Sequence, residues 1–331
     1  MNRRQFLNTS PAFLLLVTRS DLTVSTALHG RGGTGFVYDP IYLEHWLMPG
    51  HPESPQRIKS IMAAMERSGL SGVVKMLSPL PVVLQYLLLV HTKSHVNSIK
   101  THYGHSHDVA VACVGGALAA VEAVCNSIVR NAFCAVRPPG HHARNTGREE
   151  GFCLYNTVAV AARYAQQIMR LQKVLIIDWD YHHGNGTEEF FYADPTVLYF
   201  STHDYHAYPG TGDPARTGVG AGTGYNINVP MECGAGDDDF VHAFEEKLLP
   251  AARRFKPDFI LISAGFDSRK DDPLGCFALT DEGYVRLTRM IMQLADECCT
   301  GRIVSVLEGG YNVEGLASAV VHHVRTLRDV D

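Results

Sequence analysis

Three features that often assign a protein to a class are missing from this sequence. Its eight cysteines form no CxxC pair and show no short regular spacing, which predicts neither a zinc knuckle nor a disulfide scaffold. No apolar run reaches the roughly 18 residues that a membrane span requires. Basic residues number 29 against 34 acidic ones, a formal charge of −5, so no basic excess indicates a nucleic-acid partner.

Histidine, by contrast, is abundant. The 331 residues include 17 histidines, with adjacent pairs at 141–142, 182–183 and 322–323. Histidine is a common metal ligand and a general base near neutral pH, so this excess favours a metalloenzyme. With 46% hydrophobic and 19% charged residues, the chain can bury a large core, and its length fits two domains or one large α/β domain.

The first 27 residues have the features of an export signal. Arg3 and Arg4 precede Phe6-Leu7 and a short apolar segment at 11–17, and small residues at 25–27 offer a cleavage site. This order resembles a bacterial twin-arginine signal, which would carry the folded protein to the periplasm. The alternatives are a frayed terminus, a mitochondrial presequence and a cytoplasmic location. We therefore expect an export signal at 1–27 and a functional domain at 34–331.

Apolar segments alternate between short β-branched runs and longer helical patterns from about residue 35 onward. This alternation predicts a single α/β domain with a central parallel sheet and crossover helices. The predicted strands are residues 132–136, 174–177, 197–200, 259–262 and 303–307. The predicted helices lie near 55–68, 111–130, 157–171, 238–255, 280–299 and 313–328.

Polar or glycine-rich segments follow each of the five predicted strands. They begin at Arg137, Asp178, Ser201, Gly265 and Glu308. The carboxyl ends of parallel strands meet at one edge of a sheet, where ligands bind in open α/β folds. We therefore expect these segments to form one site.

The segment after residue 177 has the pattern of half a metal site. Asp178, Asp180 and His182 are two residues apart, so their side chains can converge on one side of an extended chain. Asp267, which follows the small residues Ala264-Gly265, is the expected third ligand. Two carboxylates, one imidazole and an open position describe a catalytic zinc site. The alternative is that these acids cap loops or bind a structural cation.

His141 and His142 follow Pro138-Pro139-Gly140, a stiff turn that can hold both rings at the rim. With Asp178 available to orient one ring, the pair is interpreted as a general base and its electrostatic partner. Tyr311 follows Gly309-Gly310 and would place a phenol donor where an oxyanion develops. The alternative for each of these side chains is a buried structural role.

These segments together resemble a known family, the zinc-dependent histone deacetylases and their bacterial relatives, which include acetylpolyamine amidohydrolases. The matching segments span nearly the whole chain and begin at His51, Arg137, Gly151, Asp178, Tyr208, Gly265 and Leu307. The resemblance implies the arginase/deacetylase fold and hydrolysis of an acyl-lysine-like amide. Asn185 and the Leu307-Glu308 pair are similar to class II members.

The resemblance also implies roles for individual residues. Asp180, His182 and Asp267 would bind one Zn²⁺ per chain, and His141, His142 and Tyr311 would be catalytic. Gly151, Phe152, Tyr208 and Leu274 would form the substrate channel, and Arg57 would line an exit cavity. Structural K⁺ or Na⁺ sites would use Asp178, Ser201 and backbone carbonyls including that of Thr202, and in a second site the carbonyls around Phe191, Asp194, Val197 and Tyr225.

Other interpretations remain open from the sequence. The substrate is a small-molecule or peptidyl acyl-amine, with acetylated polyamines, small amines or esters as alternatives and a non-catalytic acyl-lysine binding module as a different class. Leu274 argues against the polyamine alternative. Residues 91–110 contain no identified substrate-orienting acid, although Asp108 is near. We expect His102, His105 and His107 to be solvated in a loop, His183 to support the metal site, and His322-His323 to lie on the surface.

Overall fold

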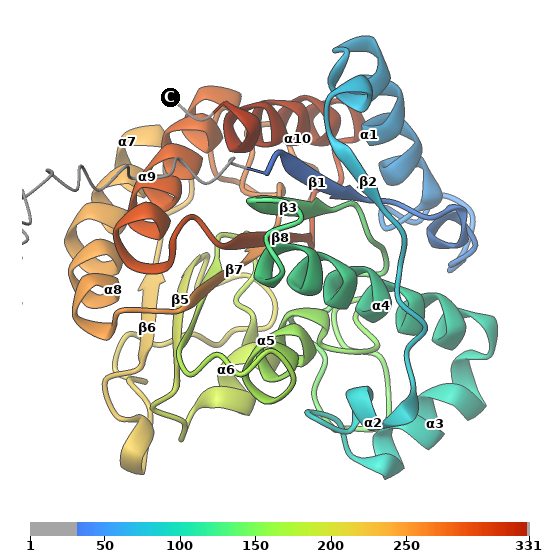
Figure 1. Ribbon diagram of the computed structural model, residues 1–331, viewed down its shortest axis with the longest axis horizontal. Helices are drawn as coiled ribbons and strands as arrows, with labels where there is room; N and C mark the ends of the chain where they lie inside the picture. Colours follow the sequence, from blue (N-terminus) through green and yellow to red (C-terminus); the bar gives the residue numbers. More distant parts are fainter. Residues whose placement is uncertain (1–31, 330–331) are drawn as a thin grey trace, which may run out of the picture. The chain divides into compact units, whose positions relative to one another are not determined.

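The computed structural model describes residues 32–329 of the chain. A single parallel sheet forms the centre of this part. The expected export signal lies outside this described part. The eight strands within it are all parallel and have the order β2-β1-β3-β8-β7-β4-β5-β6 (Figure 1). The strands are β1 Thr34–Val37, β2 Lys75–Leu77, β3 Asn131–Cys134, β4 Val174–Asp178, β5 Val197–His203, β6 Asn226–Pro230, β7 Phe259–Ala264 and β8 Ile303–Leu307.

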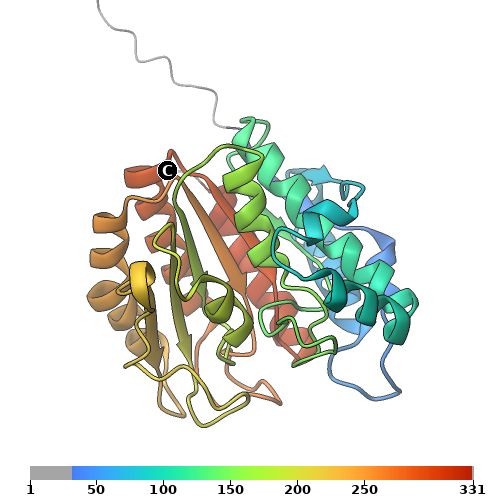
Figure 2. The ribbon, with the colours of Figure 1, turned by 90° about the horizontal axis from the view of Figure 1, so that it is seen from below.

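Helices cover both faces of the sheet (Figure 2). One face carries α1 Pro55–Arg67, α7 Asp237–Ala243, α8 Leu249–Phe255, α9 Asp281–Cys299 and α10 Val313–Arg328. The other carries α2 Leu84–Leu87, α3 Lys93–Tyr103, α4 His105–Cys125, α5 Thr157–Gln167 and α6 Asn185–Phe191. A π-helical turn, 244–248, joins α7 to α8.

The strand side chains alternate between two hydrophobic cores. Leu175 and Ile177 of β4 pack into the core beneath α9 and α10, whereas Val174 and Ile176 pack into the core beneath α4 and α5. Successive residues of a strand point to opposite faces, so a strand covered on both sides reads as a continuous apolar run. This is why the central strands are visible in the sequence.

Helix α4 has the length and apolar composition of a membrane span, but most of its residues are buried inside the fold. A core helix of a large domain meets the same criterion. Gly116 of this helix lies against Tyr42 and Val37, so the helix packs closely on its neighbours. These contacts assign α4 to the protein core.

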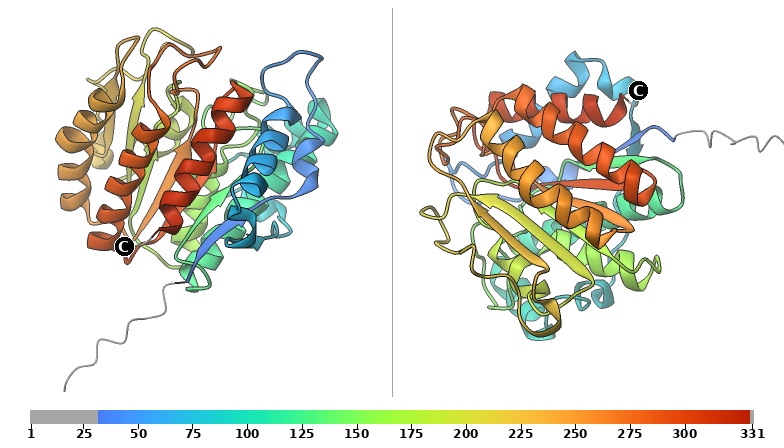
Figure 3. Two further views of the ribbon diagram at one scale, coloured as in Figure 1. Left: turned by 90° about the horizontal axis from the view of Figure 1, so that it is seen from above. Right: turned by 90° about the vertical axis from the view of Figure 1, so that its left-hand side faces the viewer.

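The loops after the strands gather at one edge of the sheet. The left view of Figure 3 shows the yellow and orange loops that follow β5 and β7 rising at the edge where the blue segment near residue 50 also lies. The five predicted strands correspond to β3, β4, β5, β7 and β8. The predicted α/β fold with one parallel sheet is confirmed, and so is the expectation that the polar segments share one rim.

Candidate active site and metal centre

The ends of two neighbouring strands bring the predicted metal ligands together. Asp178 is the last residue of β4, and Asp180 and His182 follow it before α6. β7 lies beside β4 in the sheet, and Asp267 follows its last residue, Ala264. One ligand atom from each of Asp180, His182 and Asp267 can be chosen so that all three lie within 4.8 Å of one another.

This cluster has the donor set of a divalent cation site. Asp180 and Asp267 are fully buried, and His182 Nδ1 lies 3.2 Å from Asp180 Oδ1 and 3.0 Å from Asp267 Oδ2. A side chain at Gly265 or Gly309 would overlap one of the two carboxylates, so glycine leaves room for the cluster. Burial and repulsion from Asp180 raise the pKa of Asp267 to about 7, because it is unfavourable for two neighbouring buried carboxyl groups to be ionised at the same time. Carboxylate oxygen and imidazole nitrogen are zinc ligands, so these residues fit that metal.

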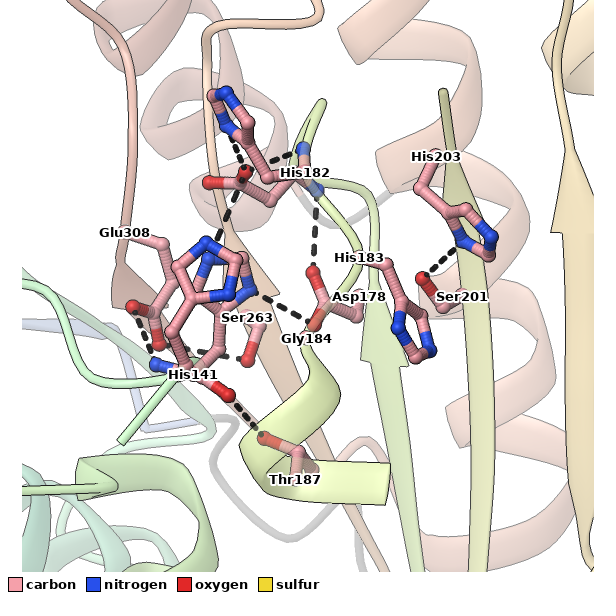
Figure 4. Close-up of polar contacts among 12 residues, drawn as sticks. His141, Asp178, His182, His183, Gly184, Thr187, Ser201, His203, Ser263 and Glu308 are labelled. Atoms are coloured by element: carbon pink, nitrogen blue, oxygen red, sulfur yellow. Dashed lines mark hydrogen bonds and ion pairs between the residues drawn. The ribbon is translucent and has the colours of Figure 1, made fainter. Parts of the chain in front are cut away.

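The two adjacent histidines lie side by side, with ring centroids 4.0 Å apart, but they have different partners. His141 Nδ1 lies 3.1 Å from the Asp178 carboxylate (Figure 4). His142 Nδ1 instead lies 2.8 Å from the Asn185 amide oxygen. Burial lowers the pKa of both rings. Two nearby aspartates more than offset this for His141 and raise its pKa well above the usual value, while the neighbouring histidines lower the pKa of His142 further. Asp178 therefore has the orienting position expected for it.

A buried glutamate, to which the sequence analysis gave no role, holds this turn in place. Glu308 Oε2 accepts hydrogen bonds from Gly140 N at 2.6 Å and His141 N at 3.1 Å (Figure 4). Burial raises the pKa of Glu308 to about 7. The segment after β8 is thereby tied to the segment after β3, which fixes the backbone that carries both histidines.

Tyr311 is held by two polar side chains from other parts of the chain. Asp272 Oδ2 accepts a hydrogen bond from Tyr311 N at 2.7 Å. The guanidinium of Arg57 lies over the Tyr311 ring, 5.0 Å from its centroid, and donates to Gly310 O at 2.6 Å. Arg57 is fully buried and pairs with Glu53 at 3.2 Å. Arg57 therefore supports the turn before Tyr311, and its expected place in an exit cavity stays a prediction.

A cavity of about 470 Å³ opens onto this group of residues. The predicted channel residues all line it: Gly151, Phe152, Tyr208 and Leu274. His142, His182 and Tyr311 line the same cavity, together with Glu149, Tyr181 and Ala207. Gly151 has φ +54°, and a side chain there would overlap the His142 ring. The structure therefore brings the predicted channel residues to one cavity with His142, His182 and Tyr311, while the buried Asp180 and Asp267 cluster with His182 and His141 lies behind His142.

The residues predicted to bind monovalent cations fall into two groups. Asp178 and Ser201 pair across β4 and β5 near the metal cluster, and the buried Thr202 hydroxyl has no hydrogen-bond partner among the described residues. Phe191, Asp194, Val197 and Tyr225 lie around the start of β5, at the other end of that strand. The carbonyls of Phe191 and Tyr225 accept backbone hydrogen bonds from Asp194 and Tyr199. Binding of K⁺ or Na⁺ stays a prediction.

Two expectations about histidines were wrong. His323 is fully buried on α10 and bonds Thr288 Oγ1 at 2.7 Å and Ser305 Oγ at 2.9 Å, because that face of α10 packs on the sheet. His102, His105 and His107 lie on α3 and α4 instead of in a loop. His102 and His105 are exposed as expected, whereas His107 is buried against the Tyr155 hydroxyl at 2.7 Å. Hydroxyl groups that are distant in the chain satisfy the buried His107 and His323 rings, and no local sequence pattern indicates them.

The cysteines also differ from expectation. Cys233 and Cys276 form a disulfide with Cα atoms 5.2 Å apart, whereas the irregular cysteine spacing predicted no disulfide scaffold. Their separation of 43 residues gives no local pattern, and only the fold brings the loop after β6 to the segment after β7. Cys276 lies two residues after Leu274, which lines the cavity.

Known proteins share this architecture. Residues 51–327 match the histone deacetylase domain. A probable deacetylase of Archaeoglobus fulgidus is 38% identical over 297 residues, which cover 85% of this chain and 82% of the relative. Histone deacetylase 15 of Arabidopsis thaliana is 40% identical over 296 residues, which cover 84% of this chain and 52% of the relative.

The structural comparison agrees with these matches. The crystal structure of the HDA15 HD domain superposes with a TM-score of 0.85 at 37% identity, covering 89% of this chain and 88% of that one. The fold is therefore the expected arginase/deacetylase fold. The chain spans about half the length of the plant relative and most of the archaeal one. This chain belongs to the histone deacetylase family.

Proposed function

We propose that this protein is a zinc-dependent amidohydrolase that removes an acyl group, such as acetyl, from a lysine-like amine. One observation carries the proposal: His142, His182 and Tyr311 line the same cavity, with Asp180 and Asp267 clustered beside His182. A general base, a metal site and an oxyanion donor around one space are the parts that amide hydrolysis needs. Family membership supports deacetylase activity in general.

Different side chains of the site would bind the metal, transfer protons and stabilise the developing negative charge. Zinc held by Asp180, His182 and Asp267 would supply Lewis-acid polarisation of the acyl carbonyl and of water. His142 takes a proton from the attacking water, while His141 is held by Asp178 and stabilises the negative charge that develops. The Tyr311 hydroxyl donates a hydrogen bond to the carbonyl oxygen as that oxygen becomes negative.

The bond changes follow from these roles. The water oxygen bonds to the acyl carbon, the C–N bond breaks, and the leaving amine takes the proton from histidine, which releases a carboxylic acid and a free amine. The aromatic side chains of Phe152 and Tyr208 line the cavity and suit an apolar methylene stem. Acetylated polyamines, small amines and esters are alternative substrates for the same groups, and a non-catalytic acyl-lysine module would leave the paired histidines and Tyr311 without a role.

Tyr311→Phe tests the catalytic assignment. Removal of one oxyanion donor should lower kcat on an acetyl-lysine peptide about 10²- to 10³-fold, because only the transition state loses a hydrogen bond. The zinc content should stay near one per chain, since Tyr311 is not a proposed ligand. Hydrolysis by Tyr311→Phe at the wild-type rate would show that this assignment is wrong.

We also propose export to the periplasm by the twin-arginine route. The Cys233–Cys276 disulfide supports this proposal, because disulfides persist in oxidising compartments. The mature N-terminus of protein recovered from its native cell tests it. Cleavage near residue 27 would support export, and an intact Met1 on all the recovered protein would argue against a cleaved signal.

Structural binding of K⁺ or Na⁺ is a further part of the proposal. Its support is the pairing of Asp178 with Ser201 beside the metal cluster. Turnover and thermal stability compared in KCl, NaCl and choline chloride at equal ionic strength test it. A higher Tm in KCl or NaCl than in choline chloride is expected, and equal values in all three salts would oppose it.

A further inference from the structure

One acidic side chain faces the cavity that contains the proposed catalytic groups. Glu149 is a cavity-lining residue, and no lysine or arginine lines this cavity within residues 32–329. Phe152, Tyr208 and Leu274 make the surrounding walls largely apolar. A substrate that passes between these walls therefore meets a single negative charge outside the metal cluster.

The backbone around Glu149 is fixed from helix α3. Glu149 N donates a hydrogen bond to the Tyr103 hydroxyl at 2.9 Å. Two residues earlier, Gly147 N donates to His95 Nδ1 at 3.0 Å, and Ser98 Oγ donates to Gly147 O at 2.6 Å. Three side chains of α3 thus hold the backbone of residues 147–149 at the cavity wall.

One oxygen of the carboxylate remains available to a ligand. Glu149 Oε1 accepts a hydrogen bond from Phe152 N at 2.8 Å, and Oε2 has no protein partner within the described part of the chain. The adjacent Glu150 is paired with Arg144 instead, and Arg144 also contacts Glu189 at 3.4 Å. Arg144 is therefore already matched by other acids, and Arg148, which precedes Glu149 in the chain, is exposed and does not line the cavity.

Asp108, the acid that the sequence placed near this region, does not line the cavity. It lies on α4 with an exposed side chain and faces His105 at 3.6 Å. A carboxylate that contacts substrate must come from the cavity wall, and Glu149 is in that wall.

From these contacts we propose that Glu149 binds a positively charged nitrogen located beyond the acylated stem, so that the preferred substrates are cationic acyl-amines. This inference rests on the proposed amide hydrolysis. The second amine of an acetylated polyamine and a basic side chain beside a peptidyl acyl-lysine both supply such a nitrogen. A hydrogen bond between a carboxylate and a cation is strong and depends on charge, so it selects for charge at that position.

A matched substrate series tests the proposal. Mono-acetylated α,ω-diamines of increasing length are compared with neutral N-acetyl amino alcohols of the same length, using the zinc-loaded full chain. The wild-type enzyme should prefer the diamine at one or more chain lengths by at least about tenfold in kcat/KM, the effect of one charged hydrogen bond. Glu149→Gln should abolish this preference, because kcat/KM should fall at least about tenfold more on the diamines than on the amino alcohols, with this selective loss in KM.

Glu149→Gln keeps an oxygen that can accept the Phe152 N–H, so a purely structural role would not produce this selective loss. Glu189→Gln is the control, because it removes the same charge from an exposed residue that does not line the cavity. It should behave as wild type. Acetyl-lysine peptides with flanking lysine or norleucine then distinguish a peptide source of the cation from a polyamine.

The outcomes separate the two proposals. If wild type hydrolyses diamines and alcohols equally, or Glu149→Gln keeps the preference, the role of Glu149 is overturned while amide hydrolysis stands. If the zinc-loaded enzyme hydrolyses none of these compounds or peptides, the proposed function itself is overturned, and the inference with it.

Discussion

At the residue scale, burial decides whether a histidine can take up a proton. The His323 ring is enclosed by Phe133, Trp179 and Phe266 and bonds two hydroxyl groups, of Thr288 and Ser305. Burial lowers its pKa to about 3. The folded protein therefore keeps this ring neutral at a pH where the unfolded chain takes up a proton.

This difference predicts a pH-dependent stability. Below about pH 6.5 the unfolded state binds a proton that folded His323 does not, so the free energy of unfolding falls as pH falls from 6.5 towards 3. Urea unfolding at pH 7 and pH 5 checks this. Between these two pH values, the free energy of unfolding of His323→Gln should fall by about 2 kcal/mol less than that of wild type. An unchanged slope in His323→Gln would contradict this account.

The sequence could predict which of the candidate side chains lie together, but not which other residues hold them in place. Asp180, His182 and Asp267 follow predicted strands, so their convergence was expected from strand topology alone. Glu308 contacts backbone N–H groups of the segment after β3, and Glu149 lines a cavity whose other walls come from distant segments. Such partners become visible only when the fold brings distant parts of the chain together.

At the element scale, a single side chain of α6 secures the loop that carries Tyr208. Glu188 is buried and accepts hydrogen bonds from Arg216 Nε at 2.7 Å, Asn226 Nδ2 at 2.9 Å and Asn228 Nδ2 at 2.7 Å. Burial would raise its pKa, but these bonds and His183 lower it to about 2. Helix α6, strand β6 and the intervening loop are thereby connected by one carboxylate.

Glu188→Gln should weaken this connection. The amide group brings a donor into a site made of donors, and we expect a loss of about 2 to 3 kcal/mol in the free energy of unfolding at pH 7. Limited proteolysis should cut the 205–225 loop faster than in wild type. Glu189→Gln, one residue away and exposed, is the control. Wild-type stability in Glu188→Gln would show that the carboxylate does not hold the loop.

The sheet strands that the sequence missed, β1, β2 and β6, are short or at an edge of the sheet, and the 11-residue helix α3 was missed as well. β2 has three residues, and β6 alternates asparagine with apolar residues because Asn226 and Asn228 bind Glu188. The predicted helix at 238–255 is interrupted by a π-helical turn, and the helix predicted at 111–130 starts earlier, at His105. Apolar periodicity identifies buried elements, whereas polar side chains with distant partners hide the others.

At the scale of the whole molecule, the disulfide joins two segments of the active-site edge. Cys233 lies in the loop after β6 and Cys276 in the segment that carries Asp267 and Leu274. The disulfide closes a loop of 43 residues and lowers the entropy of the unfolded chain. In the chain-entropy model this raises the free energy of unfolding by about 4 kcal/mol. The bond also restrains the cavity rim on the side of Leu274.

A thiol count checks this bond. The chain has eight cysteines, and six are free in the structure. Protein purified without reductant and denatured should therefore react with six equivalents of Ellman's reagent, rising to eight after reduction. Cys233→Ser should leave seven reactive thiols without reduction. Eight thiols in the unreduced wild-type protein would contradict the disulfide.

Zinc content and turnover measured on the same preparations test the central claim most directly. Wild type should contain about one zinc per chain and hydrolyse an acetylated amine, and Asp267→Asn should lose both, because that carboxylate belongs to the buried cluster. Chelation should abolish wild-type turnover and added zinc should restore it. Full turnover by metal-free wild-type protein, or by Asp267→Asn without bound metal, would contradict the account.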